Sequence, residues 1–402
     1  MTIDPTSALA PGAMPERGRR PRNRRLLILR AARKQVIDRG YDRTSMSDVA
    51  SAVAVGPSAL YRHFRTKQDL LQDIVDTSLV EVAEAIVRCH DADDPLEDLC
   101  AIGIEFRGFG VLWAREIRHF DEAARLDAET RMGVLVELVR GVLRAALERP
   151  VSLAEAWTAT CIVASPSFHR TPLARAEAVV SLRSMVVEAL DRLGRDLTST
   201  ELPPIPPSLM EPPTSRREEL LRLAIDRFAE QGYAGVGMDE IGEAAGITGT
   251  SVYNHFATKS DLLVASMMRG AEWLRLDLDR AFELGGGPET VLRALVSSYI
   301  GLTVRHPGLI GILVSEVQNL PDADRARIAQ EQRDYEAAWA TMLRQVHGDE
   351  DAGRARLRIH ATFAVANLTP RHPLLGTDGR SAVAIAADLH AVCCATLGIA
   401  GH

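Results

Sequence analysis

The 402-residue sequence lacks the long apolar runs of membrane proteins, because no run reaches the roughly 18 residues that a membrane-spanning helix needs. Its N-terminus is basic and no apolar segment follows, so we expect no signal peptide. Cysteine is also scarce. The five cysteines are odd in number and form no CxxC motif, which is typical of reduced thiols rather than of a disulfide framework. These absences predict a cytoplasmic protein with no membrane partner.

Signatures of catalysis are missing as well. The sequence contains no GxSxG motif, no Walker loop, no HExxH motif and no Cys/His cluster with metal-ligand spacing. Ser165, Ser167 and His169 lie close in sequence, but no feature of the sequence orients them as nucleophile and base. We therefore expect no enzyme, no cofactor and no metal site.

Strict alternation of apolar and polar residues, which marks a half-buried strand, is absent too. Apolar residues instead recur at spacings of three and four residues, as in amphipathic helices. The segments concerned are Leu70–Val87, Val134–Leu147, Leu182–Leu190, Leu292–Val304 and Ala384–Leu397. In a chain of ordinary globular composition, with 46% hydrophobic and 25% charged residues, this pattern predicts an all-α protein.

Lysine is rare, since only three of the 47 basic residues are Lys, yet two of the three occupy matched positions. Lys67 lies in the phrase YRHFRTKQDLL and Lys259 lies in the phrase YNHFATKSDLL. Both phrases belong to a longer repeat, in which Arg24–Leu71 matches Arg216–Leu263 over 48 residues without a gap. A repeat with so long a period indicates a duplicated domain rather than a solenoid.

Proline marks the boundary between the two copies. The segment ELPPIPPSLMEPP, at residues 201–213, contains six prolines, which remove amide donors and fix φ. It is typical of an extended linker. A fainter repeat, REIRHFDEAAR against SEVQNLPDADR, continues at an offset of 200 residues, so the whole unit is doubled. We therefore predict a basic arm (1–23), a first copy (24–195, head 24–71), a linker (196–214) and a second copy (215–402, head 216–263).

Each repeated block predicts three helices followed by the start of a long fourth helix. Ser45 and Asp48 have the spacing of a capping box before the second helix. Two short helices joined by a tight turn form a helix-turn-helix, whose second helix enters the major groove of DNA. Lys67 and Lys259 fall in the first turn of the fourth helix, where a bound phosphate also meets free N–H groups and the helix dipole. This pattern predicts that each lysine is kept because each head binds a phosphate.

Contacts with double-stranded DNA are predicted from three kinds of residue. Small side chains at the start of the recognition helix permit close approach to bases, Tyr and His reach phosphates, and Lys or Arg supplies charge. The predicted DNA-binding residues of the first copy are Arg22, Arg24, Thr44, Ser45, Pro57, Ser58, Ala59, Tyr61, Arg62, His63 and Lys67. Those of the second copy are Thr248, Gly249, Thr250, Ser251, Tyr253, Asn254, His255 and Lys259.

Both blocks resemble the N-terminal DNA-binding domain of TetR-family transcriptional regulators, in which an LYxHFxxKxxLL phrase spans the recognition helix and the start of helix four. The resemblance implies that each copy is a three-helix head plus a larger helical half for ligand binding and dimerisation. It also implies a repressor that leaves DNA when its ligand pocket is filled. The tandem arrangement resembles double-TetR repressors of actinobacteria, such as the mycobacterial repressor of a mammalian-cell-entry operon. We expect the two copies to dock on each other within one chain, as an intramolecular pseudo-dimer.

The first copy departs from the family pattern at the turn of the motif. Ala54 stands where the family usually has Gly, and Gly56 stands where a Ser or Thr cap is usual. We therefore expect the turn of the first copy to be locally shifted, with Pro57 compensating at the helix start.

Charge also separates the two heads. Residues 15–67 carry 14 basic and 4 acidic side chains, net +10, whereas residues 207–259 carry 5 and 8, net −3. Most of the difference is the arm ERGRRPRNRR, which predicts either contact with phosphates or the minor groove, or a solvated tail. Our hypothesis is that the first copy supplies most of the salt-dependent affinity. The second would add selectivity through Thr248, Thr250 and Asn254.

Two architectures for DNA binding remain open. Because the heads differ at nearly every candidate base-reading position, a monomeric pseudo-dimer would read an asymmetric operator. In the alternative, the first copy alone binds DNA in a conventional homodimer. The second copy is then a helical interaction or ligand-sensing scaffold, as its acidic head would allow.

Ligand-binding residues are predicted in the larger halves, on apolar helices that carry aromatic or polar side chains. An aromatic at helical spacing is more often part of the core than part of a pocket. The candidates are Phe106, Trp113, Trp157, Tyr299, Arg305, Trp339 and Phe363. The family resemblance implies a small hydrophobic effector, such as a lipid or an acyl-CoA ester.

Overall fold

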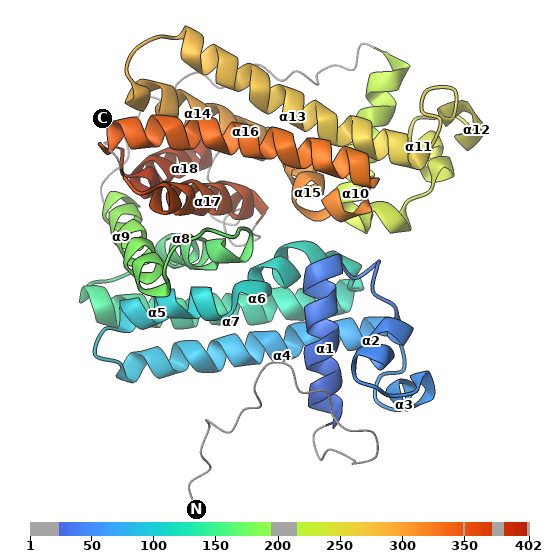
Figure 1. The fold of residues 1–402 in the computed structure, drawn as a ribbon, viewed down its shortest axis with the longest axis horizontal. Coiled ribbons are helices and arrows are strands. Elements are labelled where there is room, and N and C mark those ends of the chain that lie inside the picture. Colours follow the sequence, from blue (N-terminus) through green and yellow to red (C-terminus); the bar gives the residue numbers. More distant parts are fainter. Residues whose placement is uncertain (1–23, 194–214, 349, 372–381, 400–402) are drawn as a thin grey trace, which may run out of the picture. The chain divides into compact units, whose positions relative to one another are not determined.

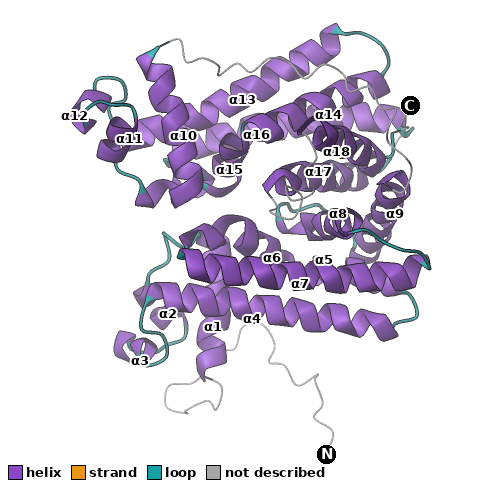
Figure 2. Cartoon of the chain, turned by 180° about the vertical axis from the view of Figure 1, so that it is seen from behind, coloured by secondary structure: helices purple, strands orange, loops and turns teal. Residues whose placement is uncertain are grey.

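The structure is a computed structural model that describes residues 24–193, 215–348, 350–371 and 382–399 (Figure 1). The predicted arm, with Arg22, and the predicted linker lie outside the described residues. Every regular element in the described part is helical, which confirms the all-α prediction (Figure 2). The cysteines are all buried free thiols.

By its internal contacts the chain divides into two compact parts, residues 1–78 and 79–402. We call residues 24–78 the first head and residues 79–402 the main body. The main body contains the larger half of the first copy and the whole second copy, whose own head is the second head (residues 216–263).

The first head consists of α1 (Arg24–Arg39), α2 (Met46–Ala52), α3 (Pro57–Tyr61) and the start of α4 (Lys67–Arg88). Helix α1 buries one apolar face and ends at Gly40, which adopts a left-handed conformation (φ +90°) while its N–H donates to the Val36 carbonyl. The predicted capping box forms: the Asp48 N–H donates to Ser45 Oγ, and the Ser45 N–H donates back to Asp48. Local signals therefore define this head.

The larger half of the first copy follows the same principle of amphipathic helices around one core. Its elements are the rest of α4, α5 (Pro95–Glu105), α6 (Arg107–Val111), α7 (Glu122–Leu147), α8 (Leu153–Ala164) and α9 (Arg175–Leu193). A short irregular segment joins α6 to α7, with a π-helix η2 (Leu112–Glu116) and a 3₁₀ turn η3 (Ile117–His119). Two more 3₁₀ turns, η1 (Cys89–Asp91) and η4 (Ser165–Ser167), follow α4 and α8.

The second copy repeats this order. Its head contains α10 (Arg216–Gly235), α11 (Met238–Ala244), α12 (Gly249–Val252) and the start of α13 (Lys259–Glu283). The larger half adds α14 (Pro288–Arg305), α15 (Pro307–Ser315), α16 (Asp322–Val346), α17 (Ala352–Leu368) and α18 (Ala382–Leu397), with 3₁₀ turns η5 (Val317–Asn319) and η6 (Thr369–Arg371). The core of the second head continues into α15 through Leu309 and Ile312, so head and larger half share one apolar cluster.

The predicted shift of the first turn is wrong. Ala54 adopts the left-handed conformation (φ +52°), as Gly246 does at the matched position (φ +67°). The backbone hydrogen bonds are also matched: the Val55 N–H donates to Ala50 O at 3.0 Å, and the Ile247 N–H donates to Gly242 O at 2.9 Å. The turn keeps its path because packing of the flanking helices holds a non-glycine residue in a strained conformation.

The last two helices of each copy pack into one four-helix bundle. Helix α9 contacts α18, α8 contacts α17, and each pair also packs within its own copy. The bundle buries apolar faces from all four helices. Arg358 of α17 crosses between the copies, where its Nη1 donates to Glu188 of α9 at 3.1 Å. The chain is therefore an intramolecular pseudo-dimer, as predicted.

Candidate DNA-binding heads and ligand cavity

The recognition helices of the two heads, α3 and α12, expose matched positions. Tyr61 and Tyr253 are 51% and 52% exposed, although each side chain is large and partly apolar. Two groups of predicted contacts are exposed beside them: Ser58, Arg62 and His63 in the first head, and Thr250, Asn254 and His255 in the second. Each head therefore presents an aromatic hydroxyl flanked by polar side chains, which suits contact with phosphates and base edges.

The short recognition helices begin differently. Thr248 caps α12, since its hydroxyl accepts a hydrogen bond from the Ser251 N–H at 3.3 Å. Gly56 precedes α3 and supplies no side-chain cap, but Pro57 occupies the first helical position, where a missing N–H costs nothing. Ala59 and Ser251 are half-buried on the inner side of these helices.

Two of the predicted DNA contacts are buried. Thr44 is 3% exposed, and its hydroxyl donates to Gly40 O at 2.9 Å. Gly249 packs so closely on α11 that a Cβ there would lie 1.7 Å from Asp239 Oδ1. Burial therefore favours a structural role for both residues over the predicted contact with DNA. Ser45 is exposed, but its hydroxyl serves the cap of α2, and Arg24 is half-buried at the start of α1.

The matched lysines stack on matched tyrosines. Lys67 Nζ lies 4.0 Å from the centroid of the Tyr41 ring, and Lys259 Nζ lies 4.2 Å from that of Tyr233. A second cation–π pair recurs beside the first, with Arg25 over Phe64 at 5.4 Å and Arg217 over Phe256 at 4.5 Å. These contacts join residues in or just after the first helix of each head to residues at or just before the start of the fourth. Stacking on tyrosine is thus a second reason, besides phosphate binding, for a lysine at the same position in both copies. Binding of a phosphate by each lysine stays a prediction.

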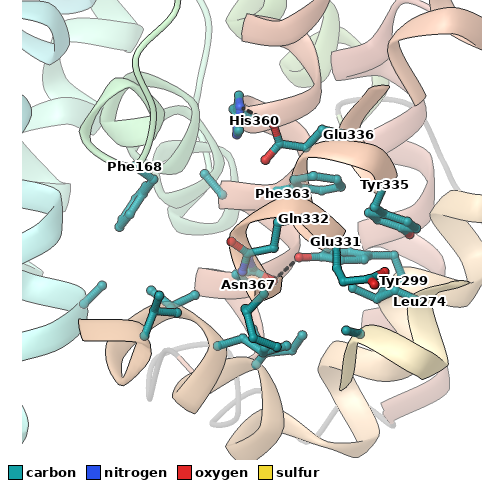
Figure 3. A pocket seen from close by; sticks show the side chains of 18 of the residues that line it. Phe168, Leu274, Tyr299, Glu331, Gln332, Tyr335, Glu336, His360, Phe363 and Asn367 are labelled. Carbon is teal, nitrogen blue, oxygen red and sulfur yellow. Dashed lines mark hydrogen bonds and ion pairs between the residues drawn. The ribbon is translucent and has the colours of Figure 1, made fainter. Parts of the chain in front are cut away.

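A cavity of about 590 Å³ lies in the second copy, in the main body (Figure 3). Helices α13, α14, α15, α16 and α17 line it, and the first copy contributes a further part of the wall. That contribution comes from Val111, Ala114 and Arg115 near η2 and from Ser167 and Phe168 after α8. The volume lies within the range of sites for small organic ligands.

An aromatic wall forms one side of this cavity. The Phe363 ring stacks on Tyr299 with centroids 4.7 Å apart, and Tyr335 lies parallel to Phe363 at 6.2 Å. Trp339, fully buried, supports this wall from behind with edge contacts to all three rings. The Tyr299 hydroxyl donates to Asn367 Oδ1 at 3.0 Å, so a polar point faces the cavity beside the rings (Figure 3).

The structure sorts the predicted ligand residues into three groups. Tyr299 and Phe363 line the large cavity, and Trp339 supports its wall. Phe106 lines a smaller cavity, described next. The others line neither of these cavities: Trp113 is half-buried in η2, Trp157 is buried in the bundle helix α8, and Arg305 is exposed at the end of α14. Glu331, Gln332 and Asn367 also line the large cavity and were not among the predicted residues.

The first copy holds the counterpart of this cavity, reduced to about 60 Å³. Most of its lining residues match residues that line the large cavity, at an offset of 200 positions, or of 192 positions on α4. Smaller or less polar side chains stand at the matched positions. The pairs are Leu99 and Tyr299, Leu135 and Tyr335, Thr160 and His360, Val163 and Phe363, and Ser167 and Asn367. The first copy is therefore largely filled where the second copy has an open cavity.

A buried ionic cluster joins the copies beside the large cavity. The Arg118 guanidinium of η3 pairs with Glu316, whose side chain is fully buried and follows α15. Arg115, which lines the cavity, pairs with Glu116 at 2.5 Å, and His119 lies 3.6 Å from the same carboxylate. Turn η3 also contacts α10 of the second head. One continuous set of charges thus connects the cavity wall, the interface between copies and the second head.

A stacked histidine pair forms another contact between the copies. His169, after α8, lies 4.2 Å from His360 of α17, with nearly parallel rings. Burial, together with the neighbouring His360 and arginine charges, lowers the pKa of His169 to about 2, so this ring stays neutral. His360 Nε2 lies 3.4 Å from Glu336 at the edge of the cavity.

Family models match three segments of the chain. The model "Bacterial regulatory proteins, tetR family" matches residues 28–74 and 220–265, which are the two heads. The model "Tetracyclin repressor-like, C-terminal domain" matches residues 285–369, which include most of the residues that line the large cavity. In the part of the chain described by the structure, no helix is long and apolar enough to cross a membrane.

Curated relatives match about a third of the chain each. The HTH-type transcriptional repressor KstR2 of Mycobacterium tuberculosis is 30% identical over 133 residues, 33% of this chain and 66% of its own length. The repressor NicS of Pseudomonas putida is 29% identical over 147 residues, 35% of this chain and 64% of its own. The matches thus span just under two thirds of these relatives.

Solved structures of single units align as well. A TetR-family regulator from Bordetella parapertussis is 19% identical with a TM-score of 0.40, covering 44% of this chain and 93% of its own. AibR in complex with isovaleryl coenzyme A and operator DNA is 24% identical with a TM-score of 0.37, covering 43% and 95%. The resemblance to the repressor of a mammalian-cell-entry operon stays a prediction. On its two matched heads and matched C-terminal domain, the chain belongs to the TetR family of bacterial regulatory proteins, with two family units in tandem.

Proposed function

We propose that this chain is a transcriptional repressor, acting in the cytoplasm, whose two non-identical heads read one asymmetric operator. The observation that carries the proposal is the pair of exposed recognition helices with matched tyrosines and unmatched neighbours. Arg62 in the first head stands opposite Asn254 in the second, and these two side chains prefer different bases, guanine and adenine respectively. Two heads that prefer different bases should bind an operator whose two halves differ in sequence, not a palindrome.

The four-helix bundle supports one chain as the reading unit. The resemblance to the TetR family implies that the last two helices of each unit form a four-helix bundle with those of a partner unit. Here α8 and α9 of the first copy already form that bundle with α17 and α18 of the second copy, inside one chain. In the alternative, a conventional homodimer in which only the first head binds DNA, α8 and α9 would have to be free to pack against a second chain. Here they already pack against α17 and α18 of the same chain. The acidic balance of the second head, net −3, is the observation that keeps the alternative worth testing.

The large cavity is the proposed effector site. Two solved relatives are associated with organic ligands: KstR2 is a ketosteroid transcriptional regulator, and AibR was solved in complex with isovaleryl coenzyme A. For this chain we infer a small hydrophobic effector that fills the cavity beside the aromatic wall and weakens DNA binding. The ionic cluster places the cavity wall in contact with the second head through Arg118 and Glu316, so occupancy has a physical route to that head.

The test is selection of bound sequences from random duplex DNA with the purified chain, with the mass of the complex measured in parallel. A non-palindromic motif held by one chain is expected. Arg62→Ala should relax the base preference on one half of the motif, and Asn254→Ala should relax it on the other half. A palindrome held by two chains, unaffected by Asn254→Ala, would instead establish the alternative.

A further inference from the structure

The charges that line the large cavity are mostly neutralised by partners. Arg115 pairs with the buried Glu116, and Glu336 pairs with Arg356 at 3.7 Å and with His360 at 3.4 Å. Two further groups of opposite sign, Arg275 and Asp334, are exposed at the rim, where water screens them. These groups leave little net charge inside the cavity.

One carboxylate is the exception. Glu331 of α16 lines the cavity and is half-buried, and within the described residues its side chain forms no hydrogen bond or ion pair. In Figure 3 it lies beside Tyr299 and Leu274, next to the aromatic wall. A carboxylate in such surroundings, partly removed from water and without a cation, repels an anion and attracts a positive charge.

The aromatic wall favours the same charge. The π-faces of Tyr299, Tyr335 and Phe363 are electron-rich, and a cation placed against such faces is stabilised further when water is excluded. The Tyr299 hydroxyl donates to Asn367 Oδ1, so oxygen atoms that accept hydrogen bonds stand beside the rings. Flat apolar surface, acceptors and one free negative charge therefore occur together.

We propose that the effector is a flat aromatic cation, one molecule per chain, held by the aromatic wall and Glu331. The proposal rests on the proposed effector site and narrows its ligand, because it excludes acids and acyl-CoA esters. The stoichiometry follows from the first copy, whose counterpart cavity holds about 60 Å³ and lacks the aromatic wall. At the position matched to Glu331 it carries Arg131, which is ion-paired with Asp127 at 2.9 Å.

The test compares two dyes that share one ring system and differ in charge, 9-aminoacridine (a cation at neutral pH) and acridine-9-carboxylate (an anion). Each is titrated into the full-length chain without DNA, because acridines intercalate, and binding is followed by fluorescence and calorimetry. One 9-aminoacridine per chain is expected, with affinity on the order of tenfold or more above that of the carboxylate. Equal affinities, two sites per chain, or no binding of either dye would overturn the proposal.

Three variants locate the site. Glu331→Gln should weaken 9-aminoacridine on the order of tenfold and leave the carboxylate dye unchanged or slightly stronger. Glu272→Gln is the matched control, since it removes the same charge from an exposed position of α13 outside the cavity lining and should change nothing. Ala271→Leu gives the cavity the residue that the first copy has at the matched position, Leu79, and should abolish binding.

The dye titration tests the ligand class, and a separate measurement of DNA binding tests the proposed function, so the two can fail independently. DNA binding is measured separately by anisotropy on the selected duplex. A chain that binds DNA but no acridine cation overturns the ligand class and leaves the regulator intact. A chain that binds the cation through Glu331 but selects no DNA sequence overturns the proposed function and leaves the ligand class standing.

Discussion

The turn of the first head offers a direct test of strain stored in the backbone. Ala54 holds φ at +52°, a conformation that costs a residue with a Cβ about 1–2 kcal/mol. Glycine removes that cost but loses about 0.5–1 kcal/mol through the greater freedom of the unfolded chain. Ala54→Gly should therefore stabilise the first head by about 0.5–1 kcal/mol.

The matched position of the second head supplies the control. Gly246 has φ +67°, and no atom lies within 4 Å of where its Cβ would stand, so Gly246→Ala changes backbone strain without a steric clash. It should destabilise the second head by a similar amount, about 0.5–1 kcal/mol. The two substitutions together exchange the residues of the two turns.

The assay is native-state hydrogen exchange on the full-length chain, read peptide by peptide, because a global melting curve averages over parts that unfold separately. The expected change is an increase in protection of about two- to fivefold for amides of α2 and α3 in Ala54→Gly. Gly246→Ala should lower protection in α11 and α12 by the same factor. Lower protection of the first head in Ala54→Gly would refute the reasoning, since it would mean that the methyl group contributes more by packing than the backbone loses by strain.

Three further predictions concern charge. Lys67→Ala and Lys259→Ala should each weaken DNA binding and lower the slope of log affinity against log salt by about 0.9, as measured by anisotropy; an unchanged slope in both would mean that the lysines only stack on tyrosine. Arg118→Ala should cost about 3–5 kcal/mol in urea unfolding, because it leaves Glu316 buried without its cation, and a loss below about 1 kcal/mol would contradict that burial. Because the pKa of His169 is lowered to about 2, the unfolded chain gains a proton that the folded chain does not take up. Stability should fall as pH drops below about 6.5, by up to about 1.4 kcal/mol per pH unit, and His169→Leu should flatten this slope.

The heads were predictable because their information is local. The capping box at Ser45, the left-handed glycines and the proline at the start of α3 each act within a few residues, and the structure contains each of them. The repeat itself indicated two such heads. The predicted shift of the first turn was wrong for a different reason. The preference for glycine over alanine in a left-handed conformation is only about 1 kcal/mol, and tertiary packing, which the sequence does not show, overrides it.

The cavity was only partly predictable, for the opposite reason. Tyr299 and Phe363 are aromatics on apolar helices, which is a signal visible in the sequence. Glu331 and Gln332 stand on α16, whose polar residues look like an ordinary solvated face until the neighbouring helices are in place. One signal was available: at the offset of 200, leucines and a valine in the first copy stand opposite tyrosines and a phenylalanine in the second. Such a contrast between duplicates marks a site that only one of them keeps.

Fusion of the two units changes what each position can do. In a symmetric homodimer every substitution appears twice, so an ion pair that crosses the interface must occur with its reciprocal. Here Arg118 of the first copy pairs with Glu316 of the second, but the reciprocal position is Gln318, and Glu116 is held by Arg115 and His119 of its own copy. The interface is therefore no longer interchangeable between copies. The same freedom allows one cavity to fill while the other stays open, and one head to turn acidic while the other stays basic. The asymmetric operator that we propose would be the DNA counterpart of this divergence.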